Sequence, residues 1–319
     1  YIFYDLETSS RDLLGQILTY AFIVTDSNYN QLDQCTGSIK LNRMQLPEPE
    51  AILTNKLNVD DLEQTGSTEY EASRHIYNFL SDYTTKTNGC TLCGYNSNAF
   101  DLNFLRNLLI RYGWNPYFRG KLKNKDILHY VESLFHLNPT QFPKILRQSE
   151  KHQFYSFKLE DISAHFQLLT KPQSHNAIED VELTIKLVKH LNEQFPETPF
   201  STFSPIQLAT NHQSQSVYEY GKSKTRDFTD HDTTPSLFKY THWLKILSSK
   251  KEILLLNLDK VTTLLHDETI PETTISQLTS PQIQSCLKYV NFNKAFLHLQ
   301  QFESEDEIKW APFLQDLTN

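Results

Sequence analysis

Two carboxylates, Asp5 and Glu7, lie one residue apart directly after the apolar run Ile2-Phe3-Tyr4. Because alternate residues of a β-strand point to the same face, a strand here would project both carboxylates together. Two like charges side by side in a buried element are costly unless a cation lies between them. The pair therefore indicates a metal site, although taken alone an ordinary solvated strand end is the commoner explanation.

A third carboxylate, Asp101, follows a stretch that ends in Gly94-Tyr95-Asn96 and reads as a strand end with a turn. Apolar residues continue from Phe104 at helical spacing, so Asp101 is expected near the start of a helix. A carboxylate is favoured there by the helix dipole, and this purely structural role is the alternative to metal binding.

A fourth carboxylate, Asp180, comes five residues after His175. Asn176 and Glu179 have the spacing of a capping box, which predicts that a helix begins at this point. Ala177 is small and would permit a neighbouring backbone to approach closely. A lone histidine is more often structural than catalytic, so this motif gains its meaning from the others.

The ordered set Asp-x-Glu, Asp and His-x-Ala-x-x-Asp resembles the DEDDh family of 3′→5′ exonucleases, which have a ribonuclease H-like fold. In that resemblance Asp5, Glu7, Asp101 and Asp180 match the metal-binding carboxylates, and His175 matches the general base. The segments 3–8, 46–54, 94–96 and 156–160, with 175–184, are similar to bacterial exodeoxyribonuclease I. Ser9-Ser10 departs from that family's aromatic-Gly, and the family's large C-terminal helical domain is expected to be lacking here.

The resemblance implies two divalent ions per site, Mg²⁺ or Mn²⁺, which prefer hard oxygen ligands such as carboxylates. Two such ions activate a water molecule and stabilise charge during phosphodiester hydrolysis. His175, with a reference pKa near neutrality, suits the acceptance of the proton from that water. Cys90 and Cys93 form a CxxC pair, but no second pair of ligands has the spacing of a zinc site.

The strands and helices that would carry the carboxylates and His175 can be predicted from the periodicity of the sequence. Strands are expected over 1–8, 18–25, 33–42, 91–94, 253–258 and 288–292. Helices are expected over 67–83, 159–166 and 176–195, after Asp101, and at the end of 46–58, while 125–137 reads as strand then helix. Residues 138–155 and 200–235 read as irregular.

The fold class expected is α/β: a ribonuclease H-like exonuclease domain with a mixed sheet, followed by a smaller SH3-like β-barrel-type domain. The run Pro196-Glu197-Thr198-Pro199 predicts the boundary. Residues 1–196 would form the DEDDh exonuclease domain, and residues 197–319 the accessory nucleic-acid-binding domain. The second assignment depends on looser similarity around 254–259 and 290–294.

The formal charge of −8 is unusual for an enzyme acting on nucleic acid, but the proposed site accounts for four of these charges. No apolar run is long enough for a transmembrane helix, so no membrane association is expected. Four cysteines in 319 residues do not form a disulfide framework, so a reducing compartment, the cytoplasm, is expected. The protein is also expected to be a monomer.

The function expected is metal-dependent 3′→5′ hydrolysis of single-stranded DNA to nucleoside monophosphates, in DNA repair. One alternative is a DEDDh exoribonuclease or oligonucleotidase, because the motifs do not discriminate the sugar. Another is a catalytically silent module that binds nucleic acid or a protein. Single-stranded DNA is the expected partner, with RNA as the alternative, and contact with the single-strand-binding protein is doubtful without the helical domain.

Overall fold

The computed structural model describes most of the N-terminal two thirds of the chain and separate segments beyond them. The described residues are 1–42, 44–138, 140–148, 153–169, 176–203, 217–221, 241–248, 252–265, 279–291 and 298–301. The chain divides into two compact units, residues 1–134 with 157–203, and residues 135–156 with 204–319. The assignment of 1–196 and 197–319 to an exonuclease and an accessory domain stays a prediction.

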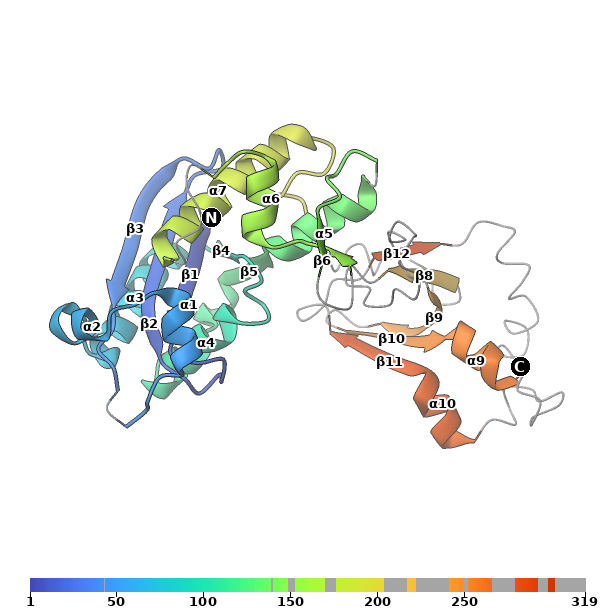
Figure 1. Ribbon diagram of the computed structural model, residues 1–319, viewed down its shortest axis with the longest axis horizontal. Helices are drawn as coiled ribbons and strands as arrows, with labels where there is room; N and C mark the ends of the chain where they lie inside the picture. The colour runs from blue at the N-terminus through green and yellow to red at the C-terminus, as the bar shows by residue number, and fades with distance from the viewer. Residues whose placement is uncertain are drawn as a thin grey trace. The chain divides into compact units, whose positions relative to one another are not determined.

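A five-stranded mixed sheet is the framework of the first unit (Figure 1). Its strands lie in the order β3-β2-β1-β4-β5, where β1–β2 and β2–β3 are antiparallel and β1–β4 and β4–β5 are parallel. The strands are β1 (Ile2–Thr8), β2 (Ile17–Thr25), β3 (Gln31–Ser38), β4 (Cys90–Gly94) and β5 (Leu122–Asp126). The parallel strands β1, β4 and β5 therefore end at the same edge of the sheet.

The helices of the first unit begin where the sequence has capping residues or strand ends. They are α1 (Pro49–Asn55), α2 (Val59–Thr65), α3 (Glu69–Lys86), α4 (Asp101–Arg111), α5 (Ile127–Leu137), α6 (Leu159–His165) and α7 (Ala177–Gln194), with a 3₁₀ turn η1 (Phe118–Gly120). Thr68 and Glu71 form a capping box at the start of α3. The strands and helices expected in this unit are thus present, with bounds shifted by a few residues.

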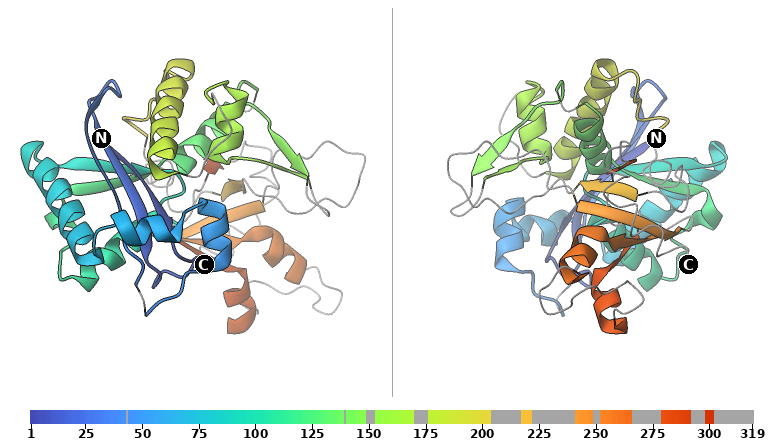
Figure 2. Two further views of the ribbon diagram at one scale, coloured as in Figure 1. Left: turned by 60° about the vertical axis from the view of Figure 1, so that its left-hand side comes forward. Right: turned by 90° about the vertical axis from the view of Figure 1, so that its right-hand side faces the viewer.

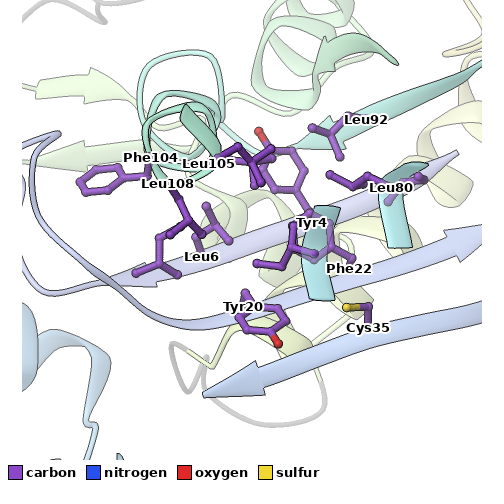
Figure 3. Close-up of a cluster of buried hydrophobic side chains, with 14 of the residues drawn as sticks. Tyr4, Leu6, Tyr20, Phe22, Cys35, Leu80, Leu92, Phe104, Leu105 and Leu108 are labelled. Atoms are coloured by element: carbon purple, nitrogen blue, oxygen red, sulfur yellow. The ribbon is translucent and has the colours of Figure 1, made fainter. Parts of the chain in front are cut away.

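One face of the sheet is covered by α3 and α4 and carries a continuous apolar core (Figure 3). Tyr4 and Leu6 of β1 point into this core, where they meet Phe104, Leu105 and Leu108 of α4 in the same cluster. Because side chains alternate along a strand, Asp5 and Glu7 are directed to the opposite face. The core thereby determines which face of β1 carries the carboxylates.

The helix α7 packs against β1 and β2 (Figure 2). Its apolar side is formed by Val181, Leu187, Val188 and Leu191, which are all buried. Ala177 is also buried, at 3% exposure. The small residue at the start of α7 leaves room for the first turn of this helix to approach the sheet.

A two-stranded sheet within 138–155 was not expected from the sequence. Strand β6 (Leu146–Gln148) pairs antiparallel with β7 (Gln153–Tyr155), so the prediction of irregular structure over 138–155 is wrong there. Each strand has only three residues, and the flanking prolines and polar side chains hide the alternation on which a strand prediction depends.

The second unit contains a five-stranded antiparallel sheet in the order β11-β10-β9-β8-β12 (Figure 1). Its elements are β8 (Val217–Gly221), β9 (Thr241–Ser248), β10 (Glu252–Asn257), α9 (Leu258–Leu265), α10 (Ser280–Cys286), β11 (Leu287–Asn291) and β12 (His298–Gln301). The strands expected over 253–258 and 288–292 are β10 and β11. Strand β8 lies within 200–235, which was expected to be irregular. Small all-β barrels are built from antiparallel strands, but an SH3-like barrel stays a prediction for this chain.

Within the described segments, no helix combines the length and the apolar character that crossing a membrane requires.

Candidate metal centre

Three carboxylates meet on the face of the sheet opposite the α3–α4 core. Asp5 and Glu7 come from β1, and Asp180 comes from the first turn of α7. One carboxylate oxygen from each lies within 4.8 Å of the others, and these three residues form the candidate metal group within the described part of the chain. Glu7 is 9% exposed and Asp180 is 7% exposed, so these two carboxylates are largely withdrawn from water, whereas Asp5 is partly buried.

The placement of Asp180 follows from the way α7 begins. The side chain of Asn176 accepts a hydrogen bond from the backbone amide of Ile178 at 3.1 Å, which confirms the expected N-cap. The helix start is thus defined by its cap, and Asp180 follows four residues later. His175 lies outside the described residues, so its predicted role is not tested by the structure.

Asp101 lies beside the three carboxylates but has a different contact. It is the first residue of α4, as expected, and it is 5% exposed. Its Oδ1 accepts a hydrogen bond from the backbone amide of Leu6 at 3.2 Å, between Asp5 and Glu7 in the chain. Strand β4 pairs with β1 only at Ile2 and Phe3. The Asp101 carboxylate therefore provides the hydrogen-bond acceptor for an amide of β1 that lies past the end of this pairing. Asp101 is not one of the three residues grouped within 4.8 Å.

Burial and mutual repulsion disfavour the charged forms of these carboxyl groups. Burial raises the pKa of Glu7 to about 9, with further contributions from Asp5 and Asp180. Burial also raises the pKa of Asp5 well above its ordinary range, with Asp101 and Asp180 adding to the rise. The pKa of Asp101 rises to about 8, mainly by burial and against the effect of its backbone hydrogen bonds. A divalent cation among these groups would reverse the pattern by stabilising the carboxylates.

A tightly packed loop carries Asp101 from β4 to α4. Gly94 is required at its start, because a Cβ there would lie 2.6 Å from Cβ of Ser97 and 2.9 Å from Cε1 of Tyr4. The far side of the loop is anchored by Asp126, which accepts hydrogen bonds from the amides of Asn96 and Asn98 at 2.9 Å each. No role was expected for Asp126 from the sequence. The available signal was its position between the strand and the helix that were expected over 125–137.

A hollow of about 360 Å³ opens beside Glu7. Its lining combines polar and charged groups with one aromatic ring: Glu7, Thr8, Ser10, Arg11, Glu48, Glu50, Ala51, Thr54, Asn55 and Phe100. The backbone carbonyl oxygen of Thr8 accepts a hydrogen bond from Asn55 Nδ2 at 3.1 Å, which attaches α1 to the end of β1. Ser10, one of the two residues that depart from the exodeoxyribonuclease I pattern, thus borders a hollow next to the carboxylates.

The CxxC pair has the properties of buried structural thiols. Cys93 is buried and Cys90 is half-buried, and both are free thiols. Burial raises the pKa of Cys90 to about 11 and that of Cys93 to about 12. Because zinc binding and thiol–disulfide exchange use the thiolate, this environment disfavours both.

No family model matches the chain. The exodeoxyribonuclease I of Buchnera aphidicola subsp. Acyrthosiphon pisum is 30% identical over 207 residues, which are 61% of this chain and 46% of that protein. The chain therefore spans about half the length of this curated relative.

Solved structures of exonuclease I share the fold over nearly the whole chain. Exonuclease I from Methylocaldum szegediense has a TM-score of 0.72 at 20% identity, covering 100% of this chain and 70% of that one. The zinc-bound complex of E. coli exonuclease I with single-stranded DNA has a TM-score of 0.70 at 18% identity, covering 99% and 69%. The fold is thus the α/β fold with a mixed sheet that occurs in these nucleases. The chain is thus similar to exodeoxyribonuclease I in sequence and in fold, which confirms the resemblance found in the sequence.

Proposed function

We propose that this protein is a metal-dependent 3′→5′ exonuclease that hydrolyses single-stranded DNA to nucleoside monophosphates. The observation that carries the proposal is the convergence of Asp5, Glu7 and Asp180, whose carboxylate oxygens lie within 4.8 Å of one another. A module that only binds nucleic acid or protein has no need for three carboxylates at this spacing, whereas phosphodiester hydrolysis by metal ions requires such ligands.

The donor set fits a hard divalent cation. All of its donors are carboxylate oxygens, the ligand type that Mg²⁺ and Mn²⁺ prefer. Within the described residues, no lysine or arginine forms an ion pair with Asp5 or Glu7. Asp5, Glu7 and Asp180, with Asp101 beside them, would hold two ions. Such ions supply activation of water and stabilisation of charge on the attacking and leaving oxygens.

The other groups of the site have separate tasks in this proposal. His175, directly before the cap of α7, accepts the proton of the attacking water. The hollow beside Glu7 receives the nucleotide at the 3′ end, with Phe100 offering an aromatic face to a base. Because the hollow adjoins the carboxylates, a terminal nucleotide in it would present its phosphodiester bond to them. The polarity of cleavage is inferred from the resemblance to the 3′→5′ exonucleases.

The experiment uses end-labelled single-stranded DNA, duplex DNA and RNA of one sequence, with Mg²⁺ or Mn²⁺ and with EDTA. We expect single-stranded DNA to be shortened from its 3′ end, with release of monophosphates and complete inhibition by EDTA. Asp5→Asn conserves side-chain volume and should abolish shortening. Asp26→Asn, in the turn between β2 and β3, changes a carboxylate outside the metal group and should leave it intact.

Other results would replace the proposal. Faster degradation of RNA would identify the exoribonuclease or oligonucleotidase alternative. Binding without cleavage under every metal condition would identify the silent module. A cytoplasmic location, a monomeric state and the doubtful contact with the single-strand-binding protein stay predictions.

A further inference from the structure

Asp126 is a buried carboxylate outside the metal group, and its hydrogen bonds are directed at the backbone. It is the last residue of β5 and is 3% exposed. Its Oδ1 accepts hydrogen bonds from the backbone amides of Asn96 at 2.9 Å and Leu128 at 3.0 Å. Its Oδ2 accepts a hydrogen bond from the backbone amide of Asn98 at 2.9 Å. One side chain therefore satisfies three backbone donors, two of which belong to the loop between β4 and α4.

That loop depends on these contacts for its shape. Asn96 has a left-handed backbone with φ of 58°, a conformation that is uncommon for non-glycine residues and that Asn adopts more readily than most. The side chain of Asn124, also on β5, donates to Oδ1 of Asn98. The backbone carbonyl oxygen of Asn98 accepts from Asn103 Nδ2 of α4 at 3.2 Å. Asn98 is thus attached to the strand on one side and to the helix on the other.

The loop delivers Asp101 to its position. Asp101 begins α4 three residues after Asn98, and its Oδ1 meets the amide of Leu6. Leu6 lies between Asp5 and Glu7 in the chain. A displacement of the loop would therefore move the Asp101 carboxylate away from its place beside these two residues. A continuous series of hydrogen bonds and covalent links runs from β5 through the loop to β1.

We propose that Asp126 is a positioning residue, which holds the β4–α4 loop so that Asp101 lies against Leu6 beside the metal group. This inference rests on the proposed function. Groups that orient a metal ligand change metal affinity by about 10- to 100-fold when they are removed. Asp126 acts in this way at one step further from the cation, through the backbone of the loop.

The substitution Asp126→Asn tests the inference with little change of volume. An amide keeps one accepting oxygen but places an NH₂ group where the other oxygen accepted, so one loop anchor becomes a contact between two donors. Asp26→Asn is the matched control. Asp26 also accepts two backbone amides, from Asn28 at 2.8 Å and Asn30 at 2.9 Å, in the turn between β2 and β3.

Two quantities are measured on the full chain: Mn²⁺ affinity, by calorimetric titration, and hydrogen exchange of the Leu6 amide in EDTA. For Asp126→Asn we expect Mn²⁺ to bind about tenfold more weakly and the Leu6 amide to exchange faster. Asp26→Asn should change neither quantity. A general loss of stability would accelerate exchange at many amides, so exchange at Leu6 is compared with exchange at Phe22 in the core.

Unchanged Mn²⁺ affinity in folded Asp126→Asn would overturn the inference. If the unsubstituted chain binds no Mn²⁺, the proposed function fails, and the Leu6 exchange rate then decides the positioning role alone: faster exchange supports it and an unchanged rate overturns it. If Asp126→Asn does not fold, Asn124→Ala replaces it and removes only the side-chain anchor at Asn98. The same two quantities and the same criteria apply to that variant.

Discussion

The Oδ1 atom of Asp101 accepts a hydrogen bond from the backbone amide of Leu6 at 3.2 Å. Asp101 thus has two contributions, a charge beside the metal group and an acceptor for a buried amide of β1. These contributions differ in what they require, since the charge needs an ionised carboxyl group and the amide needs only an oxygen. Substitutions at this residue can therefore separate them.

Asp101→Asn retains an accepting oxygen for Leu6 but removes the charge. We expect hydrolysis to fall by at least about tenfold. In EDTA above pH 8, where the Asp101 carboxyl group is ionised, the free energy of unfolding should stay level or rise, because a like charge is removed. Asp101→Ala also loses the hydrogen bond, and its free energy of unfolding should be lower than that of Asp101→Asn by about 1–3 kcal/mol. Urea unfolding of both variants checks this order, and equal stabilities would contradict the role of the Leu6 contact.

Stability without metal should depend on pH in an unusual direction. The pKa of Glu7 is raised from 4.5 to about 9 and that of Asp101 from 3.8 to about 8. At pH values between the ordinary and the raised pKa of each group, the folded chain binds more protons than the unfolded chain. Its free energy of unfolding therefore falls as pH rises. We expect the thermal midpoint in EDTA to decrease through this window, and added Mg²⁺ to raise it most at the alkaline end.

The matched variant for this prediction is Glu7→Gln, which removes one of the titrating groups. Its thermal midpoint in EDTA should depend less steeply on pH than that of the unsubstituted chain. A midpoint that rises through the window, or a slope that Glu7→Gln leaves unchanged, would show that these carboxyl groups do not have raised pKa values.

Gly94→Ala should destabilise the loop that carries Asp101. The new Cβ would lie 2.6 Å from Cβ of Ser97, a contact that requires the chain to shift. We expect the free energy of unfolding to fall by about 1–3 kcal/mol, the usual cost of overpacking. Ser97→Gly in the same chain removes that Cβ and should recover part of the loss in urea unfolding. Additive effects of the two substitutions would argue against a direct clash.

His175→Ala should separate proton transfer from metal binding. If His175 accepts the proton of the attacking water, its removal should slow hydrolysis by about 10²- to 10⁴-fold. Mn²⁺ affinity should stay close to that of the unsubstituted chain, since the carboxylates are intact. Single-turnover rates and calorimetric titration are the two measurements. Unchanged turnover would exclude His175 as the base, and a parallel loss of Mn²⁺ affinity would indicate a ligand instead.

Local sequence pattern was sufficient for most elements of the first unit. The alternation in β1 and the capping residue Asn176 are properties of neighbouring residues, so they are visible without a fold. The hairpin of β6 and β7 was missed because its strands are too short to show alternation. The expected domain bounds, the SH3-like barrel and the role of His175 remain predictions.

The sequence by itself determined that Asp5 and Glu7 share one face of a strand, and that Asp101 and Asp180 lie at helix starts, because each of these facts depends on spacing of a few residues. Only the tertiary structure decided how they meet. The strand order β3-β2-β1-β4-β5 brings the ends of β1, β4 and β5 to one edge, so that Asp101 reaches Leu6 and Asp126 holds the loop between them. Those contacts join residues far apart in the chain, and no local periodicity encodes which strand lies beside which.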